Sequence, residues 1–147
     1  MRKFLAGAGL MVYALSFFLW AVTDFRGYYC AAFALVDPWR DGWRWGNERL
    51  WEYVSLLLSG WVNPLFLTAV VLGFLRPRSW VAAVFGGLTL LCLPFSWIVF
   101  GYEGMYPRAG HVLWVAGIVV MLAAMWLTKS AAAQTRPGTR VMGSTLA

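Results

Sequence analysis

The sequence contains four long stretches without a single charged residue. They are residues 4–22, 53–75, 79–101 and 110–128. About 20 apolar residues in a helix cross the ~30 Å hydrocarbon core of a bilayer. Each stretch is therefore predicted to be a transmembrane helix. The predicted fold is an all-α, polytopic membrane protein in which four transmembrane helices form a left-handed antiparallel bundle.

The charged residues lie between these stretches, and their signs separate when alternate connections are placed on alternate sides. One side receives seven basic residues and no acid: Arg2, Lys3, Arg76, Arg78, Lys129, Arg136 and Arg140. The other receives Arg26, Arg40, Arg44, Arg49 and Arg108 with all six acids, Asp24, Asp37, Asp41, Glu48, Glu52 and Glu103. Basic residues collect on the cytoplasmic side of membrane proteins, so the N and C termini are both predicted to be cytoplasmic.

The length of 147 residues accommodates one domain. Residues 1–129 are predicted to form the transmembrane domain with an outer loop at 23–52, and the polar residues 130–147 a disordered cytoplasmic tail. The net charge of +6 lies close to the predicted membrane boundaries, which indicates topology and contact with lipid headgroups rather than nucleic-acid binding. The expected location is an integral, multi-pass position, in the inner (plasma) membrane of a bacterium.

The outer loop contains a second, shorter apolar segment at residues 27–36. Ten residues are too few to span a bilayer, so this segment is predicted to be an interfacial or re-entrant element. The pattern leaves open whether it lies on the membrane or dips into it. Asp37 and Pro38 are expected to end it, because the residue before a proline is displaced from helical geometry. Asn47 is the expected N-cap of the second spanning helix.

Aromatic and guanidinium groups alternate in the second half of the outer loop. Arg planes stack on Trp rings, and both residue types are common in binding hot spots. Anchoring to lipid headgroups uses the same residues and is an equal alternative. The candidate partner-binding residues are Trp39, Arg40, Trp43, Arg44, Trp45 and Arg49.

Two features inside the predicted spans are candidates for function or for helix contact. Asn63 and Pro64 form a candidate intramembrane polar site, because Pro64 is expected to break or kink its helix and free a carbonyl. The alternative is that Asn63 makes an interhelical hydrogen bond. Pro94 is expected to break the next helix. A stripe of small residues predicts a close helix contact or self-association: Ala82, Ala83, Gly86 and Gly87.

The outer boundary carries the only histidine, within a candidate cluster of Glu103, Arg108 and His111. His111 is expected to begin its helix hydrogen-bonded to Glu103 or to water, and Arg108 to pair with Glu103; the alternative is that His111 titrates at this boundary. One histidine excludes bis-histidine haem ligation within the chain, and no cofactor or metal site is predicted. Cys30 and Cys92 form no C-x-x-C pair and are expected to be small buried residues; a disulfide between them requires the outer segment to dip into the bundle.

The sequence lacks the residues and motifs that several classes of membrane protein and enzyme require. The spans contain no carboxylate for proton-coupled exchange, and no Arg of the kind that membrane glutathione transferases use. No set of catalytic residues is present, so the chain is predicted not to be an enzyme. The expected function is a non-catalytic, partner-binding role as a complex subunit, accessory factor or immunity-type protein. Its partners would be the bilayer and another membrane or periplasmic protein. The alternative is a small oligomeric channel or carrier with helices broken at Pro64 and Pro94.

Overall fold

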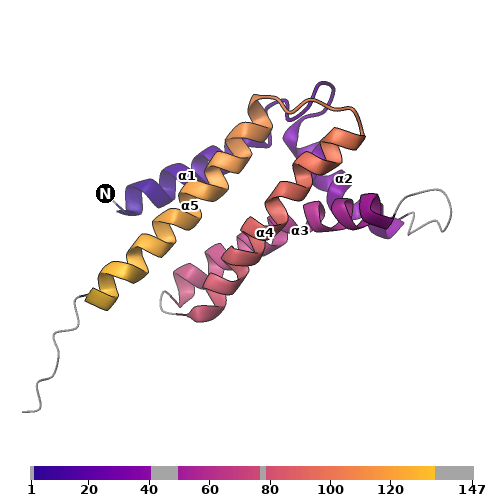
Figure 1. Ribbon diagram of the computed structural model, residues 1–147. Helices are drawn as coiled ribbons and strands as arrows, with labels where there is room; N and C mark the ends of the chain where they lie inside the picture. Colours follow the sequence, from indigo (N-terminus) through magenta and orange to yellow (C-terminus); the bar gives the residue numbers. More distant parts are fainter. Residues whose placement is uncertain (1, 41–49, 77–78, 135–147) are drawn as a thin grey trace, which may run out of the picture.

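The computed structural model describes residues 2–40, 50–76 and 79–134, and five α-helices run through these ranges. Helix α1 packs against α5, α3 against α4, and α2 against α3 (Figure 1). The protein is therefore all-helical, as the sequence predicts. The helices are α1 (Arg2–Ser16), α2 (Gly27–Arg40), α3 (Leu50–Leu75), α4 (Trp80–Tyr102) and α5 (Ala109–Gln134).

Three helices are long and apolar enough to cross a membrane: Leu50–Leu75, Trp80–Tyr102 and Ala109–Leu127. They coincide with three of the predicted spans. Helix α4, with 23 residues, is about 34 Å long and exceeds the ~30 Å hydrocarbon core. These three helices indicate an integral membrane protein.

The first predicted span is longer than the helix that the structure contains. Helix α1 has 15 residues and ends at Ser16 rather than at residue 22, so it is about 22 Å long. The carbonyls of Phe17 and Leu19 accept hydrogen bonds from the N–H groups of Tyr28 and Gly27, at 3.0 and 2.9 Å. In a longer α1 these carbonyls would accept hydrogen bonds from residues of the same helix. Here they bond to the start of α2 instead, and the chain reverses direction.

Helix α2 replaces the predicted element at 27–36, and its expected end at Asp37 and Pro38 is wrong. The helix continues through Pro38 to Arg40. Pro38 has no N–H group, which leaves the carbonyl of Ala34 without its helical donor. Gly60 of α3 lies directly against this carbonyl, because a Cβ at Gly60 would overlap the Ala34 oxygen. Packing of backbone on backbone therefore holds α2 on α3 and overrides the local preference of proline.

The sequence predicts a kink or a break at Pro64 and a break at Pro94. No break is present, because α3 and α4 remain α-helical through both residues. A proline removes one backbone donor, and a helix packed between neighbours tolerates that loss. Figure 1 shows α3 changing direction along its length, so the proline is accommodated without interrupting the helix.

The hydrophobic core lies where α1, α3, α4 and α5 meet. Residues from all four helices are buried there: Tyr13, Val62, Phe66, Ala69, Val70, Cys92, Leu93, Ile118, Met121 and Leu122. Helices α1 and α5 approach closely, since a Cβ at Gly117 would lie 2.6 Å from the backbone nitrogen of Tyr13. Helix α5 continues to Gln134, so the tail predicted from residue 130 is helical at its start. Residues 135–147 lie outside the described ranges.

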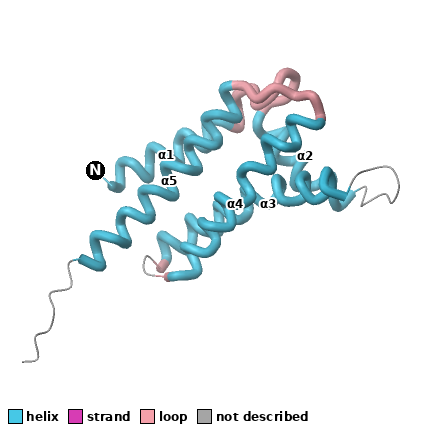
Figure 2. Tube along the Cα trace, in the orientation of Figure 1, coloured by secondary structure: helices cyan, strands magenta, loops and turns pink. Residues whose placement is uncertain are grey.

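The connections collect at two ends of the molecule. Figure 2 shows the turns at 17–26 and 103–108 together at one end, called the loop end below, and the end of α3 with the start of α4 at the other. Backbone hydrogen bonds join the two turns at the loop end. The N–H of Arg108 donates to the carbonyl of Ala21 at 2.8 Å, and the N–H of Gly110 donates to the carbonyl of Trp20 at 3.0 Å. This sorting of connections is the one that successive crossings of a bilayer require.

Candidate functional site

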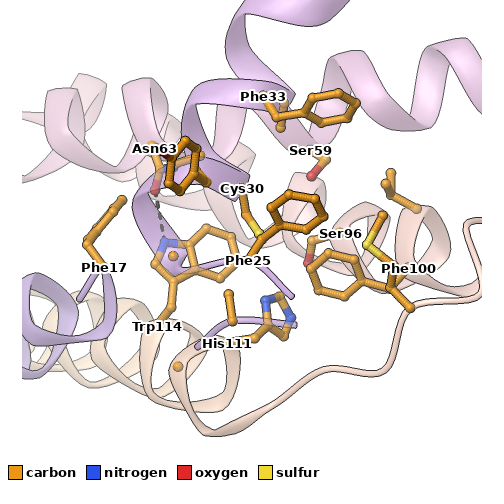
Figure 3. Close-up of a pocket in the computed structure, with 18 of the residues that line it drawn as sticks. Phe17, Phe25, Cys30, Phe33, Ser59, Asn63, Ser96, Phe100, His111 and Trp114 are labelled. Carbon is orange, nitrogen blue, oxygen red and sulfur yellow. Dashed lines mark hydrogen bonds between the residues drawn. The ribbon is translucent and has the colours of Figure 1, made fainter. Parts of the chain in front are cut away.

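A cavity of about 290 Å³ lies at the loop end, between α2, α3, α4 and α5 (Figure 3). Turn residues from both connections at the loop end also line it, including Phe25 and Met105. Aromatic rings form part of its walls, supplied by Phe17, Phe25, Tyr29, Phe33, Phe100 and Trp114.

The cavity exists because α2 turns small side chains toward the bundle. Cys30, Ala31 and Ala34 line it, and they are too short to fill the space between α2 and α3. The larger residues of α2, Tyr29 and Phe33, reach the cavity from its rim and are 57% and 51% exposed. In residues 27–39 small and large side chains alternate with the period of a helix, so the sequence predicts that one face of this helix carries small residues. It does not show which helix that face packs against.

Asn63, half of the predicted intramembrane polar site, lines the cavity and joins three helices. Its Oδ1 accepts a hydrogen bond from Trp114 Nε1 of α5 at 2.9 Å (Figure 3). The same oxygen accepts a second bond from Tyr13 Oη of α1 at 3.0 Å. Within the described part of the chain, no group accepts a hydrogen bond from its amide nitrogen. Pro64 is not among the residues that line the cavity. The interhelical bond that the sequence offered as an alternative is therefore present, with Tyr and Trp as partners.

His111 is the least expected feature of the wall. The side chain is 4% exposed, and its Nε2 is buried without a hydrogen-bond partner among the described residues. The imidazole lies among the rings of Trp97, Phe100 and Trp114, with centroids 4.8 to 5.3 Å away. A buried polar group left unpaired costs about 1–3 kcal/mol. Figure 3 shows the edge of the ring directed into the space between the labelled side chains.

The predicted outer-boundary cluster does not assemble. Glu103 and Arg108 are exposed whereas His111 is buried, and in residues 79–134 no bond joins His111 or Arg108 to Glu103. The reason is that the turn at 103–108 bonds by its backbone to Ala21 and leaves its charged side chains at the surface. Glu103 and His111 still line the same cavity, one at its mouth and one within.

Most of the predicted partner-binding residues cannot be placed. Trp39 is 65% exposed near the end of α2, and Arg40 is the last residue of that helix. Trp43, Arg44, Trp45 and Arg49 lie outside the described residues, so a surface that contains them stays a prediction.

The predicted contact stripe on α4 is divided between two environments. Ala82 and Gly86 are buried, and a Cβ at Gly86 would meet the Cδ2 of Leu122 in α5 at 3.2 Å. Ala83 is half-buried, and a Cβ at Gly87 would meet open space. Ala82 and Gly86 therefore pack inside a single chain. Self-association through Ala83 and Gly87 stays a prediction.

The two cysteines occupy different surroundings and are both free thiols. Cys30 is half-buried at the cavity, and Cys92 is 6% exposed in the core. Burial raises the pKa of the Cys30 thiol, which keeps it neutral near pH 7. The described residues contain no group of three His, Cys, Asp or Glu side chains placed to hold a metal ion. The cavity is suited to non-covalent binding of a neutral molecule.

Comparison with protein-family models, with curated proteins and with solved structures finds no match for this chain. Function is therefore inferred from the geometry of the cavity and from the membrane-spanning helices.

Proposed function

We propose that this protein is a non-catalytic membrane protein that binds a small, mostly apolar molecule in the cavity beneath α2. The supporting observation is the combination of an aromatic cavity of about 290 Å³ with an unpaired, buried His111 nitrogen on its wall. Ligand pockets are typically apolar concavities of about this size or larger, with a few polar groups that fix orientation. The cavity has this composition.

In this proposal α1 crosses the membrane together with α3, α4 and α5, and both termini are cytoplasmic. The short α1 is complemented by the turn at 17–26, whose backbone groups are paired with α2 and α5 rather than exposed to lipid. The loop end then faces outward, because the positive residues lie at the opposite end. A reporter fused at Arg140 tests this: it should be active only as a cytoplasmic marker, and an external signal would contradict the orientation.

A partner-binding role is the second candidate, and the outward face of α2 favours it. Tyr28, Val36 and Trp39 are 43%, 54% and 65% exposed, so this face of α2 offers large side chains that a partner or lipid can cover. Another membrane or periplasmic protein that docks on this face would also cover the helix that closes the cavity. Binding of a partner and binding of a ligand are therefore compatible.

The channel alternative has less support. Phe66, Ile118 and Met121 are fully buried below the cavity, so the space is closed toward the opposite end. Helices α3 and α4 are continuous through their prolines, and the Asn63 oxygen is engaged in two bonds. These features favour a closed pocket over a pore through one chain.

The test is uptake of durene (1,2,4,5-tetramethylbenzene) by the purified protein in detergent, measured by equilibrium dialysis against protein-free micelles. The wild-type protein should bind durene above the micelle background. Ser59→Leu should abolish this excess, because Ser59 lines the cavity and Leu fills it. Leu67→Phe on the exposed face of α3 is the matched control and should bind normally. Equal uptake by wild type, Ser59→Leu and micelles would contradict the proposal.

A further inference from the structure

The unpaired polar groups of the cavity specify its ligand more closely. Resting on the proposed function above, we propose that the cavity binds the neutral ring of a quinone, with one carbonyl oxygen bonded to His111 Nε2 and the other facing the α3 wall of Ser59 and Asn63. The ligand class follows from volume, wall chemistry, the direction of the free hydrogen bonds and charge.

The volume fits a substituted single ring. An apolar cavity of about 150 Å³ holds one benzene molecule, and this cavity, at about 290 Å³, has roughly twice that volume. A molecule of about twelve non-hydrogen atoms is the corresponding size. A quinone ring with four small substituents has this number of atoms.

The aromatic wall favours a flat ring over an acyl chain. Phe25, Phe100 and Trp114 line the cavity together, and aromatic rings gain from offset or edge-to-face contact with another ring. An acyl chain would fill the same volume but would leave the His111 nitrogen unpaired. A ring that carries an oxygen satisfies both requirements.

Each of the polar groups that remain free can donate a hydrogen bond. Asn63 uses its oxygen for Tyr13 and Trp114, which leaves the NH₂ group. Ser59 lines the cavity, and no hydrogen bond of its hydroxyl is formed within the described ranges. With the proton of His111 on Nε2, donors stand on the α5 wall and on the α3 wall. Two walls of donors match a ligand with an acceptor at each end, which is the arrangement of a 1,4-quinone.

Charge excludes the commonest competing lipids. The one charged side chain that lines the cavity within the described residues is Glu103, and it is exposed at the mouth. A carboxylate at the entrance repels phosphate headgroups, and no lining cation is available to bind them. The lining therefore disfavours an anionic ligand, and a neutral quinone meets this condition.

Duroquinone (tetramethyl-1,4-benzoquinone) is the test probe. It has twelve non-hydrogen atoms and no free ring position to which Cys30 could add. Durene, which carries the same four methyl groups on a flat six-carbon ring without the oxygens, is the matched probe. Calorimetric titration of the intact protein in nanodiscs should show duroquinone binding at least about tenfold more tightly than durene, the change expected for one buried hydrogen bond.

His111→Phe should weaken duroquinone to the affinity of durene and leave durene unchanged. The ligand-free unfolding temperature should stay level or rise, because an unpaired buried nitrogen is removed. Thr89→Val, a fully buried polar position outside the cavity, is the control and should keep the preference for duroquinone. A fall in unfolding temperature with an unchanged preference in His111→Phe would overturn His111 as the anchor.

The outcomes separate the two proposals. Equal affinity of wild type for duroquinone and durene, both lost in Ser59→Leu, would overturn the quinone assignment and leave the cavity as a binding site. Absence of binding of either probe to the wild type would overturn both.

Discussion

The middle of the bundle and its loop end use small residues to opposite effect. In the middle, Gly117 brings the backbones of α1 and α5 into contact, and the neighbouring Phe66 and Met121 are fully buried. At the loop end, Cys30 and Ala31 of α2 face a space of about 290 Å³ instead. A small residue thus marks a position where either a backbone or a ligand can approach. Which of the two occurs depends on where the opposing helix is held, and at the loop end Gly60 fixes that position.

The largest contrast is expected from removing one aromatic ring in each region. Phe66→Ala should lower the free energy of unfolding by about 3–5 kcal/mol, because the ring is fully buried and the packed surroundings relax only in part. Phe100→Ala should cost much less, since this half-buried ring already borders the cavity. Denaturation in detergent followed by circular dichroism measures both. Equal losses would show that the loop end is packed as tightly as the core.

Glycine substitutions test the close approach in the middle region. Gly117→Ala should cost about 1–3 kcal/mol, because the new Cβ would lie 2.6 Å from the Tyr13 nitrogen and 2.9 Å from its Cα. Gly7→Ala on α1 is the matched control, with nothing within 4 Å. Helix propensity should make that variant more stable by up to about 1 kcal/mol. Shifts of the same sign in the two unfolding temperatures would contradict the contact between α1 and α5.

Asn63 lies at the border of the two regions, and its replacement should have a smaller effect. Asn63→Leu should cost about 1 kcal/mol, the usual scale of hydrogen bonds between membrane helices. In a double-mutant cycle with Tyr13→Phe, the two losses should not add, because both remove the same 3.0 Å bond. Additive losses in thermal unfolding would mean that the bond contributes nothing to stability.

The three long apolar helices could be predicted from the sequence, because their length and composition alone suit a bilayer. The ends and interruptions of helices could not. Residues 17–22 are as apolar as α1, yet the helix ends at Ser16 because its carbonyls pair with Gly27 and Tyr28. Proline locally disfavours the interior of a helix, yet the prolines at 38, 64 and 94 all lie inside helices, where tertiary packing outweighs this preference.

Individual residues of the candidate site could be predicted from the sequence, but the cavity that they line could not. Asn63 and His111 stand out in the sequence as polar residues in or beside apolar stretches. Their surroundings do not, because the cavity depends on how α2 sits on α3, and that contact joins Ala34 to Gly60, residues far apart in the chain. His111 was grouped with Glu103 and Arg108 by sequence proximity, and the fold buries the first and exposes the others.

The two native cysteines give the most direct measurement of the central claim, that the loop end is a ligand site and the middle a closed core. N-ethylmaleimide labelling of the native protein should modify Cys30 and leave Cys92 unmodified. Because burial raises the pKa of the Cys30 thiol, its labelling rate should still increase with pH above about 9.5. An ordinary thiol, with a pKa of about 8.5, is almost fully ionised there and its rate levels off. Saturating duroquinone should slow Cys30 labelling at every pH. Labelling of Cys92 at a similar rate, or a Cys30 rate unaffected by duroquinone, would contradict the account.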